Sequence, residues 1–345
     1  MPTHAHSPLH LLPRDHSPVR VALAGLGSMG VIHLKALTSL QAGISEAYYK
    51  ADLPQQIKRM KICALCDPDL HKQQNFPNIP FYQEWQTLLQ EQQPHIALIA
   101  SPTLSHFELA SQALDAGVHT LVEKPITPTL QECQTLIHSA ATHGCRLLAG
   151  HVERYNPVAI KLHHLINDEG LQIRQYRFER TQAHPSRIPD DIIIDKLIHD
   201  LDLVHYLFGS VQKVEVRSSR IIKDRIMEME VSLLHEEGVR GQLFVSWLVP
   251  DDAPKCRQVH LQSTTGDLFQ GDFIQKRLSV NDRDIACDVQ GWIAPANNQI
   301  KDQLVDFFAY CLAPPPQIPP PLLSPQEMEE SIRIIEHIRS ISYHV

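Results

Sequence analysis

A short apolar run near the start of the chain leads directly into three glycines at a characteristic spacing. Residues 19–24 are followed by Gly25-Leu26-Gly27-Ser28-Met29-Gly30, and a helix-like apolar pattern comes next. In such a turn Gly25 allows the sharp exit from a strand, Gly27 the close approach of a pyrophosphate, and Gly30 tight helix packing. The free N–H groups at the helix start also attract negative charge. An ordinary strand-to-helix turn is the alternative, but the flanking pattern favours a dinucleotide site formed by these six residues.

Length and composition limit the class of partner that this chain can bind. Its 345 residues are enough for two domains with a buried core. A content of 43% hydrophobic and 20% charged residues is typical of a globular protein. The net charge of −8 and the lack of basic runs argue against nucleic acid. The apolar runs are short and interrupted by charge, so we expect no membrane span.

The first 18 residues and the cysteines bear on processing and compartment. Residues 1–18 are rich in His, Pro and Ser and have no apolar stretch of signal-peptide length, so we interpret them as a flexible tail. Its histidines could bind a metal only adventitiously. These are His4, His6, His10 and His16. Seven cysteines at irregular spacing predict free thiols in the cytoplasm. Cys63 and Cys66 lie on an expected strand, where residues three apart point to opposite faces, so we expect no redox role.

Strand and helix patterns alternate through the first 150 residues, which predicts a parallel α/β sheet. The expected strands are 19–24, 61–66, 96–100, 120–123 and 146–149, and the expected helices are 84–90, 105–116 and 130–142. We therefore predict a Rossmann dinucleotide-binding domain over residues 19–150.

The pattern changes after Tyr155-Asn156-Pro157, which we interpret as a turn. Alternating segments indicate strands at 172–180, 211–217, 227–234, 241–247, 257–263 and 276–280. Helices are expected at 299–311 and 325–341, with a stiff extended linker at 314–321 between them. Residues 151–345 are thus predicted to form a second α/β domain with an open, largely antiparallel mixed sheet that binds substrate and forms oligomers.

Asp67 follows the second expected strand and bears on the choice of dinucleotide. An acidic residue at this position commonly binds the adenine-ribose hydroxyls and disfavours a 2′-phosphate, which favours NAD over NADP. It lies further from Gly30 than the roughly 20 residues that are usual, and a helix-like insertion at 43–59 accounts for the excess. The alternative is that Asp67 simply opens a turn before Pro68.

Two further segments follow expected strands of the first domain. Ser101-Pro102-Thr103 and His106 come after the strand at 96–100, at the edge where open α/β sheets bind ligands. Ser101 and Thr103 could instead only cap the next helix. Glu123-Lys124-Pro125 ends another strand, and the proline fixes the backbone beside Lys124. At the mouth of a nucleotide site this lysine could polarise a substrate oxygen, whereas elsewhere it would be a surface charge.

A helical segment around residues 195–206 carries the clearest acid–base pattern. At 100° per residue Asp195, His199, Asp202 and Tyr206 fall within one polar stripe, apart from an apolar stripe on the same helix. A histidine beside carboxylates suits general acid–base work. A solvated face with an Asp–His pair is the alternative. Because no Cys/His cluster supplies further ligands, we expect no metal site.

Together these segments resemble the glucose-fructose oxidoreductase / inositol dehydrogenase (Gfo/Idh/MocA) family over nearly the whole chain from Val19. The strings that carry the resemblance are GLGSMG, SPTLSHFELASQALDAGVHTLVEKP and DKLIHDLDL. The resemblance implies NAD as cofactor, with NADP possible, and a homodimer or homotetramer formed through the bare face of the second sheet. It also implies that Lys124, Asp195 and His199 face the nicotinamide and the substrate. The cofactor-binding residues expected on these grounds are Gly25, Leu26, Gly27, Ser28, Met29, Gly30, Asp67, Ser101, Pro102, His106, Glu123 and Lys124. Many relatives have glycine where this chain has Leu197, a departure shared with the inositol-dehydrogenase-like and UDP-sugar-oxidising branches.

Within the family the chain looks most like the UDP-N-acetylglucosamine 3-dehydrogenase branch. Residues 150–157 (GHVERYNP) and the string IHDLDL carry this looser match. A nucleotide-sugar substrate is plausible because Arg154, Lys255 and Arg257 could contact a diphosphate, although they could equally be ordinary surface or sheet-edge residues. The resemblance implies oxidation of a sugar hydroxyl, with inositol or a monosaccharide as the alternative substrate. A dinucleotide-binding regulator without catalytic activity is the alternative from another class.

Overall fold

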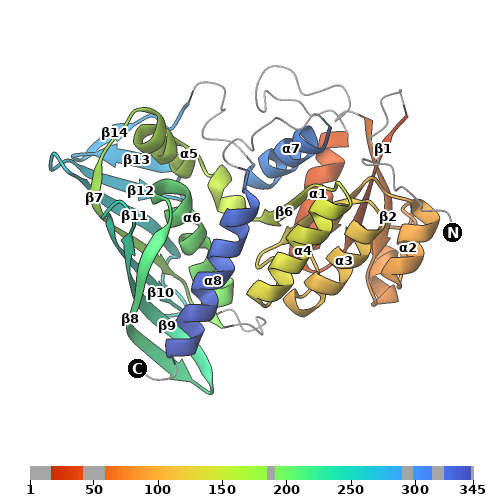
Figure 1. Ribbon diagram of the computed structural model, residues 1–345, viewed down its shortest axis with the longest axis horizontal. Coiled ribbons are helices and arrows are strands. Elements are labelled where there is room, and N and C mark those ends of the chain that lie inside the picture. The colour runs from red at the N-terminus through yellow and green to blue at the C-terminus, as the bar shows by residue number, and fades with distance from the viewer. Residues whose placement is uncertain (1–16, 42–58, 185–190, 290–297, 313–321, 343–345) are drawn as a thin grey trace. The chain divides into compact units, whose positions relative to one another are not determined.

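The computed structural model describes residues 17–41, 59–184, 191–289, 298–312 and 322–342. The expected tail up to residue 16, residues 43–58 of the expected insertion and the whole expected linker at 314–321 lie outside the described residues. The chain divides into two compact units, shown in Figure 1. One comprises residues up to Gly150 together with 298–329, and the other comprises 151–297 together with 330–345.

The first unit is built on a six-stranded parallel sheet in the order β3-β2-β1-β4-β5-β6. Its strands are β1 (Val19–Ala24), β2 (Met60–Cys66), β3 (Phe81–Tyr82), β4 (Ile96–Ile99), β5 (His119–Glu123) and β6 (Leu147–Gly150). Strands β1 and β4 are almost wholly buried, as expected for apolar runs covered on both faces. The strand order reverses between β1 and β4, where open α/β sheets bind ligands beyond the carboxyl ends of their strands. The predicted Rossmann fold is confirmed.

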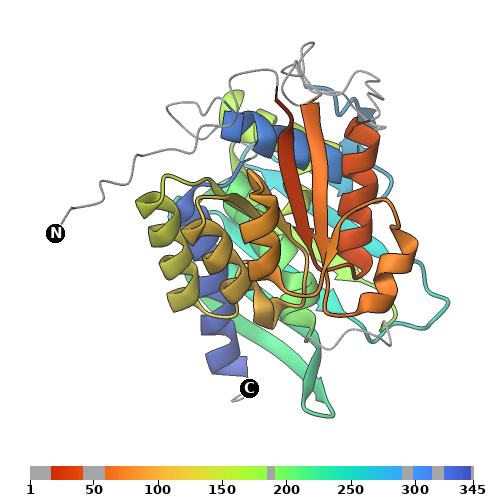
Figure 2. The same ribbon diagram turned by 90° about the vertical axis from the view of Figure 1, so that its right-hand side faces the viewer.

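Helices cover both faces of this sheet, with α1 on one side and α3 and α4 on the other (Figure 2). Their bounds are α1 (Ser28–Gln41), α2 (Trp85–Gln92), α3 (His106–Asp115) and α4 (Leu130–Thr142). Short 3-10 segments, η2 (Leu70–Asn75) and η3 (Thr103–Ser105), follow β2 and β4. Helix α4 begins as predicted because Thr129 and Glu132 form a capping box at its start.

Helix α7 (Gln299–Leu312) belongs to the first unit, which corrects the expectation of a continuous second domain over 151–345. It packs against α1, and the Nζ atom of Lys301 donates a hydrogen bond to Oγ of Ser39 over 2.6 Å. Its buried face carries Leu304, Val305, Phe307 and Phe308. The apolar stripe of α7 is therefore buried within the Rossmann unit, a partner that local sequence does not reveal.

The second unit contains an eight-stranded mixed sheet in the order β14-β13-β12-β11-β7-β10-β9-β8. Its strands are β7 (Ile173–Thr181), β8 (Val211–Ile222), β9 (Arg225–His235), β10 (Arg240–Ser246), β11 (Cys256–Ser263), β12 (Leu268–Asp272), β13 (Arg277–Val280) and β14 (Arg283–Ile285). Among the described strands of this sheet only β7 and β10 pair in parallel, so the largely antiparallel mixed sheet is confirmed. Strands β12 and β14 were not expected.

One face of the second sheet is covered by helices. Alternate residues such as Tyr176, Phe178 and Val231 point into a core shared with α5 (Pro157–His163) and α6 (Ile198–Phe208). Helix α8 (Pro325–Ser342) begins in the first unit, and its later residues add three isoleucines to the core of the second. The charged residues between the buried ones, for example Arg177, lie on the other face. This alternation is typical of an antiparallel sheet with one uncovered side.

The expected turn at Tyr155-Asn156-Pro157 is instead the start of helix α5. Residues 152–155 form a 3-10 turn, η4 (Val152–Tyr155), and Asn156 then caps α5 by accepting a hydrogen bond from the Val158 amide over 3.1 Å. Pro157 occupies the first helical position, where a missing N–H group costs nothing. Within the described residues, no helix is both long and apolar enough to cross a membrane.

Candidate active site

The glycine turn after β1 has the close contacts that the sequence predicts. Gly25 has a φ of +89°, and a Cβ on it would lie 2.5 Å from the backbone nitrogen of Ser101. A Cβ on Gly30 would lie 1.8 Å from the carbonyl oxygen of Gly25. Gly27, by contrast, has nothing within 4 Å of its missing Cβ. The residues present therefore fit a dinucleotide: the turn is packed from behind and open where a pyrophosphate would approach.

Asp67 is tied to this glycine turn. Its buried carboxylate accepts hydrogen bonds from the amides of Leu26 (2.7 Å) and Asp69 (3.0 Å), and the ammonium of Lys72 lies 2.8 Å away. Burial by itself raises the pKa of Asp67, but the hydrogen bonds from Lys72, Leu26 and Asp69 hold it below its usual value. The carboxylate is therefore ionised at the end of β2. The sequence did not reveal Lys72.

The turn after β4 is joined to the turn after β5 by one histidine. His106 is 1% exposed, and its ring nitrogens lie 2.8 Å from the carbonyl oxygen of Pro125 and 2.9 Å from that of Ser101. The hydroxyl of Ser105 donates to that of Ser101 over 2.8 Å, whereas Leu104 is 87% exposed. The expected cofactor residues Ser101 and His106 thus lie together beside Gly25.

The Glu123-Lys124-Pro125 turn has a buried acid and a partly exposed lysine. The Glu123 carboxylate lies 2.6 Å from the Nε2 atom of His33, on helix α1, and accepts a hydrogen bond from the Lys124 amide over 3.2 Å. Burial raises the pKa of Glu123, but the hydrogen bonds and positive charges of His33 and Lys124 together outweigh it and keep the pKa below the ordinary value. Sequence reasoning missed His33, a single histidine in an otherwise apolar stretch of helix.

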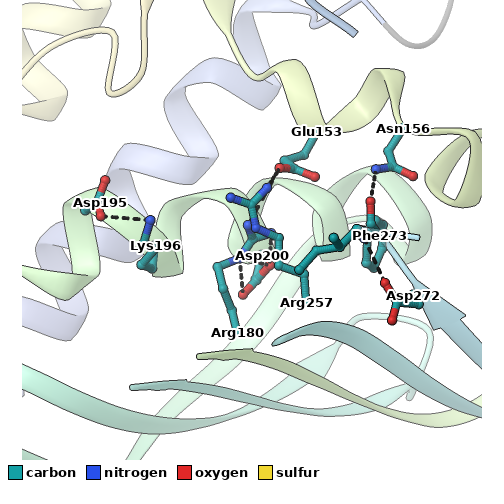
Figure 3. A network of polar contacts seen from close by, with 10 residues as sticks. Glu153, Asn156, Arg180, Asp195, Lys196, Asp200, Arg257, Asp272 and Phe273 are labelled. Carbon is teal, nitrogen blue, oxygen red and sulfur yellow. Dashed lines mark hydrogen bonds and ion pairs between the residues drawn. The ribbon is translucent and has the colours of Figure 1, made fainter. Parts of the chain in front are cut away.

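In the second unit the candidate acid–base residues lie where a π-helix becomes an α-helix. Residues Ile193–Leu197 form the π-helix η6, and α6 follows directly. Asp195 and His199 are partly exposed, and the Asp195 carboxylate lies 3.1 Å from the ammonium of Lys196 (Figure 3). π-Helical turns are rare and frequently occur at functional sites.

The other members of the predicted polar stripe, Asp202 and Tyr206, are buried, which argues against the alternative of a solvated face. Asp202 lies 2.8 Å from the guanidinium of Arg154. That guanidinium also lies 4.9 Å from the ring centre of Tyr206. Arg154 is only 1% exposed, so the expected contact with a substrate diphosphate is not supported. It anchors α6 instead.

A second buried ion pair fastens the same helix to the sheet, as Figure 3 shows. The Nη2 atom of Arg180, on β7, lies 2.7 Å from the Asp200 carboxylate. Glu153 lies 2.8 Å from Arg257 and 3.7 Å from Arg180. Burial lowers the pKa of Arg180, but the carboxylates of Asp200 and Glu153 outweigh it and raise that pKa. The sequence did not predict this network. Lys255, another candidate for contact with the substrate diphosphate, lies outside the network and is exposed.

The described residues contain no group of three or more His, Cys, Asp and Glu side chains that could hold a metal ion. The chemistry available in the first unit is dinucleotide binding beside a lysine, and that in the second is acid–base chemistry at Asp195 and His199. A Rossmann unit with a lysine at the carboxyl edge of its sheet, joined to a mixed-sheet unit, defines a class of dinucleotide-dependent oxidoreductases.

Comparison with protein families identifies this class more closely. Residues 19–151 match the model described as an oxidoreductase family with an NAD-binding Rossmann fold, and residues 171–268 match the GFO/IDH/MocA C-terminal domain. The chain belongs to the GFO/IDH/MocA oxidoreductase family, and its cofactor is NAD.

Individual relatives act on several sugars and polyols. UDP-N-acetylglucosamine 3-dehydrogenase from Acidithiobacillus ferrooxidans is 33% identical over 163 residues, 46% of this chain and 50% of the relative. An inositol 2-dehydrogenase from Salmonella paratyphi B is 21% identical over 205 residues, 56% of each chain. The matches thus span about half the length of these curated relatives.

Solved structures agree over a longer span and establish the fold. A structure of the Acidithiobacillus ferrooxidans dehydrogenase covers 94% of this chain and 97% of its own, with a TM-score of 0.76 at 22% identity. Levoglucosan dehydrogenase in complex with NADH covers 95% of this chain and 98% of its own, with a TM-score of 0.81 at 17% identity.

Proposed function

We propose that this chain is an NAD-dependent dehydrogenase that oxidises a secondary hydroxyl of a sugar, namely C3 of a UDP-linked N-acetylhexosamine. The observation that carries the proposal is the 33% identity to a UDP-N-acetylglucosamine 3-dehydrogenase within a family of NAD-binding oxidoreductases. The packed glycine turn and the partly exposed Lys124, Asp195 and His199 are consistent with it.

In the proposed reaction His199 is the general base that takes the proton of the sugar hydroxyl. When bound, NAD⁺ would supply the hydride acceptor: the carbon that bears this hydroxyl would lose a hydride to it, so the alcohol would lose two electrons and become a ketone. Lys124 donates a hydrogen bond to the reacting oxygen and stabilises the negative charge that develops there. Asp195 orients the sugar or the ring of His199. The backbone amides around Gly27 and the carboxylate of Asp67 would hold the dinucleotide.

Inositol or another free polyol is the second candidate substrate, favoured by the match to inositol 2-dehydrogenase. The chemistry at the hydroxyl would be the same, so the two candidates differ in whether the protein recognises a nucleotide. UDP alone should then raise the melting temperature if the substrate is a UDP-sugar, because a ligand that binds only the folded state stabilises it. A rise in melting temperature with inositol and none with UDP would make a free polyol the first candidate substrate and a UDP-sugar the second.

The test of activity is formation of NADH absorbance with UDP-N-acetylglucosamine, UDP-N-acetylgalactosamine, inositols and free hexoses. Turnover with a UDP-N-acetylhexosamine and a ketone product at C3 supports the proposal. Tight NADH binding without turnover on any of these compounds would instead indicate a dinucleotide-binding regulator.

We further propose that the uncovered face of the second sheet joins copies of the chain into a homodimer or homotetramer. This face bears a depression of about 700 Å³ whose lining includes Arg177, Lys213, Glu215 and Arg217. Arg177 pairs with Glu230 over 2.7 Å and Arg217 with Glu215 over 2.9 Å, so both signs of charge occur on one face. A surface with both signs can complement a copy of itself about a two-fold axis. Light scattering after size-exclusion chromatography, on the wild type and on Arg177→Glu, tests the assembly.

All seven cysteines are free thiols, and six of them are buried. Burial raises the pKa of Cys63 to about 11 and that of Cys66 to about 12, so both are inert thiols rather than a redox pair. Free thiols fit a reducing compartment, and we propose that the protein acts in the cytoplasm.

A further inference from the structure

The backbone of the Glu123-Lys124-Pro125 turn is held from two sides by buried histidines of the first unit. The side chain of Lys124 is partly exposed, while its neighbours Glu123 and Pro125 are buried. A lysine that hydrogen-bonds a particular substrate oxygen needs a fixed backbone position, since small displacements of a catalytic group strongly reduce the reaction rate. The contacts of the two neighbouring residues therefore determine where the Lys124 side chain begins.

The first contact runs from helix α1 through the Glu123 carboxylate. His33 Nε2 lies 2.6 Å from one carboxylate oxygen, and the other oxygen accepts the Lys124 amide over 3.2 Å. The backbone of β6 closes the remaining side, because a Cβ on Gly150 would lie 3.2 Å from that second oxygen. The helix that begins at the glycine turn thus fixes the Lys124 amide through a single carboxylate.

The second contact runs from helix α3 to the Pro125 carbonyl. His106 Nδ1 lies 2.8 Å from that oxygen, and Nε2 lies 2.9 Å from the Ser101 carbonyl oxygen. Carbonyl oxygens only accept, so both contacts are hydrogen bonds when the ring carries a proton on each nitrogen. In that form His106 ties the Lys124 turn to the segment behind Gly25.

We propose that His33 and His106 are positioning residues for Lys124, His33 acting through Glu123 and His106 through the Pro125 carbonyl. The proposal rests on the proposed role of Lys124 at the sugar hydroxyl. Neither histidine needs to touch the sugar. The alternative is that both only satisfy buried polar groups, in which case their loss lowers stability and leaves the turnover of folded protein unchanged.

Substitutions that keep or remove the hydrogen-bond donor separate these possibilities. In His33→Leu and His106→Leu we expect kcat, measured well below the melting temperature, to fall at least tenfold. In His33→Leu, which changes none of the expected cofactor residues, the Kd for NADH should stay within threefold. His33→Gln keeps a donor of similar reach and should recover most of the rate. The asparagine side chain of His33→Asn is one methylene shorter than glutamine. This variant replaces His33→Leu in the test if the leucine variant does not fold, and its kcat should stay as low as that expected for His33→Leu.

His119 provides the matched control, because it is a buried histidine on the same strand as Glu123. Its Nδ1 accepts the Arg146 amide over 3.0 Å at the start of β5, away from the lysine turn. His119→Leu should lower the melting temperature and leave kcat unchanged. Equal kcat values for folded His33→Leu, His106→Leu and His119→Leu would overturn the positioning role.

Hydrogen–deuterium exchange tests the same claim without any turnover. Peptides that cover residues 123–127 should exchange faster in the His33 and His106 leucine variants than in wild type or His119→Leu. If these peptides exchange faster in the leucine variants but the wild-type protein oxidises no sugar, then the two histidines still anchor the Lys124 turn and only the proposed function is rejected. Unchanged exchange of these peptides in folded variants would overturn the anchors themselves.

Discussion

The ammonium of Lys72 lies 2.8 Å from the same Asp67 carboxylate oxygen that accepts the Leu26 amide. One buried acid thus fixes the glycine turn and holds a cation beside the position where an adenine ribose is bound in Rossmann folds. The acid disfavours a 2′-phosphate there, but the lysine beside it attracts one. The balance between NAD and NADP therefore depends on this pair.

Replacing Asp67 by Ser should shift the preference toward NADP. The change removes the negative charge and frees Lys72, whose ammonium can make a charge-assisted contact worth roughly 1.5–3 kcal/mol, or about 10- to 150-fold in affinity. We expect the ratio of the Kd for NADPH to that for NADH, from nicotinamide fluorescence, to fall by at least about tenfold. The gain should disappear in Asp67→Ser/Lys72→Met. Equal ratios in the single and double variants would show that Lys72 takes no part in the choice.

The Arg180–Asp200 pair predicts a large stability effect at a position away from the expected cofactor residues. Arg180→Met leaves two buried carboxylates, Asp200 and Glu153, without their shared cation, which should cost about 3–5 kcal/mol in the free energy of unfolding. Arg180→Met/Asp200→Leu should recover much of the loss, because an apolar pair of similar volume replaces an ion pair well. Urea denaturation of the three proteins measures both effects.

Arg177 on the same strand gives the control for this prediction. Its carboxylate partners Glu179 and Glu230 lie 2.8 and 2.7 Å away on the uncovered face, where all three side chains are about one-third exposed. In a monomer solvent screens such a pair, so Arg177→Met, measured at a protein concentration at which light scattering gives a monomer, should cost no more than about 1 kcal/mol. A loss for Arg180→Met as small as that for Arg177→Met would mean that burial adds nothing to the pair.

His235 predicts a loss of stability in mild acid. Burial lowers its pKa below the ordinary 6.5 and outweighs the hydrogen bond to the Gly209 carbonyl at 2.9 Å, which raises it. Tyr176 Oη lies 2.7 Å from the other ring nitrogen. The unfolded chain then binds this proton at higher pH than the folded chain does. Stability is full above the unfolded pKa and falls as the pH drops through 6.5, by at most about 1.4 kcal/mol per pH unit for one proton. His235→Gln should reduce this slope between pH 7.5 and 5.5, whereas a slope equal to wild type would contradict the assignment.

The Rossmann unit could be predicted from local patterns because its strands are apolar runs and its helices have clear ends. Helix α4, for example, has the bounds 130–142 that the sequence predicts, because its capping box is local. Asn156-Pro157 carries an equally local signal, a side-chain cap followed by proline at the first helical position, but the same two residue types are also common in turns. The placement of α7 depends on a distant partner, α1, and could not be predicted from its own residues.

The parts of the candidate site that depend on local backbone conformation could be predicted from the sequence. The parts that depend on side chains far apart in the sequence could not. Gly25 and Gly30 follow from the turn that they must make. His33 and Glu123, by contrast, are 90 residues apart and meet only in the folded sheet. The burial of Arg154 could not be predicted for the same reason, because a charged residue is expected at the surface unless its buried partner, here Asp202, is known.

His199→Asn is the most direct test of the proposed chemistry. Asparagine keeps the approximate size of the ring but cannot accept a proton near neutral pH, and loss of a general base typically costs roughly 10²–10⁴-fold in rate. We expect kcat to fall in that range while NADH still binds, because the glycine turn, not His199, would hold the pyrophosphate. His164→Asn is the control, because His164 lies in a surface pair with Asp168.

Lys124→Ala should also lose rate, because the developing oxygen charge loses its hydrogen-bond donor. Full activity in His199→Asn would assign the proton to another group, and full activity in Lys124→Ala would make that lysine an ordinary surface charge.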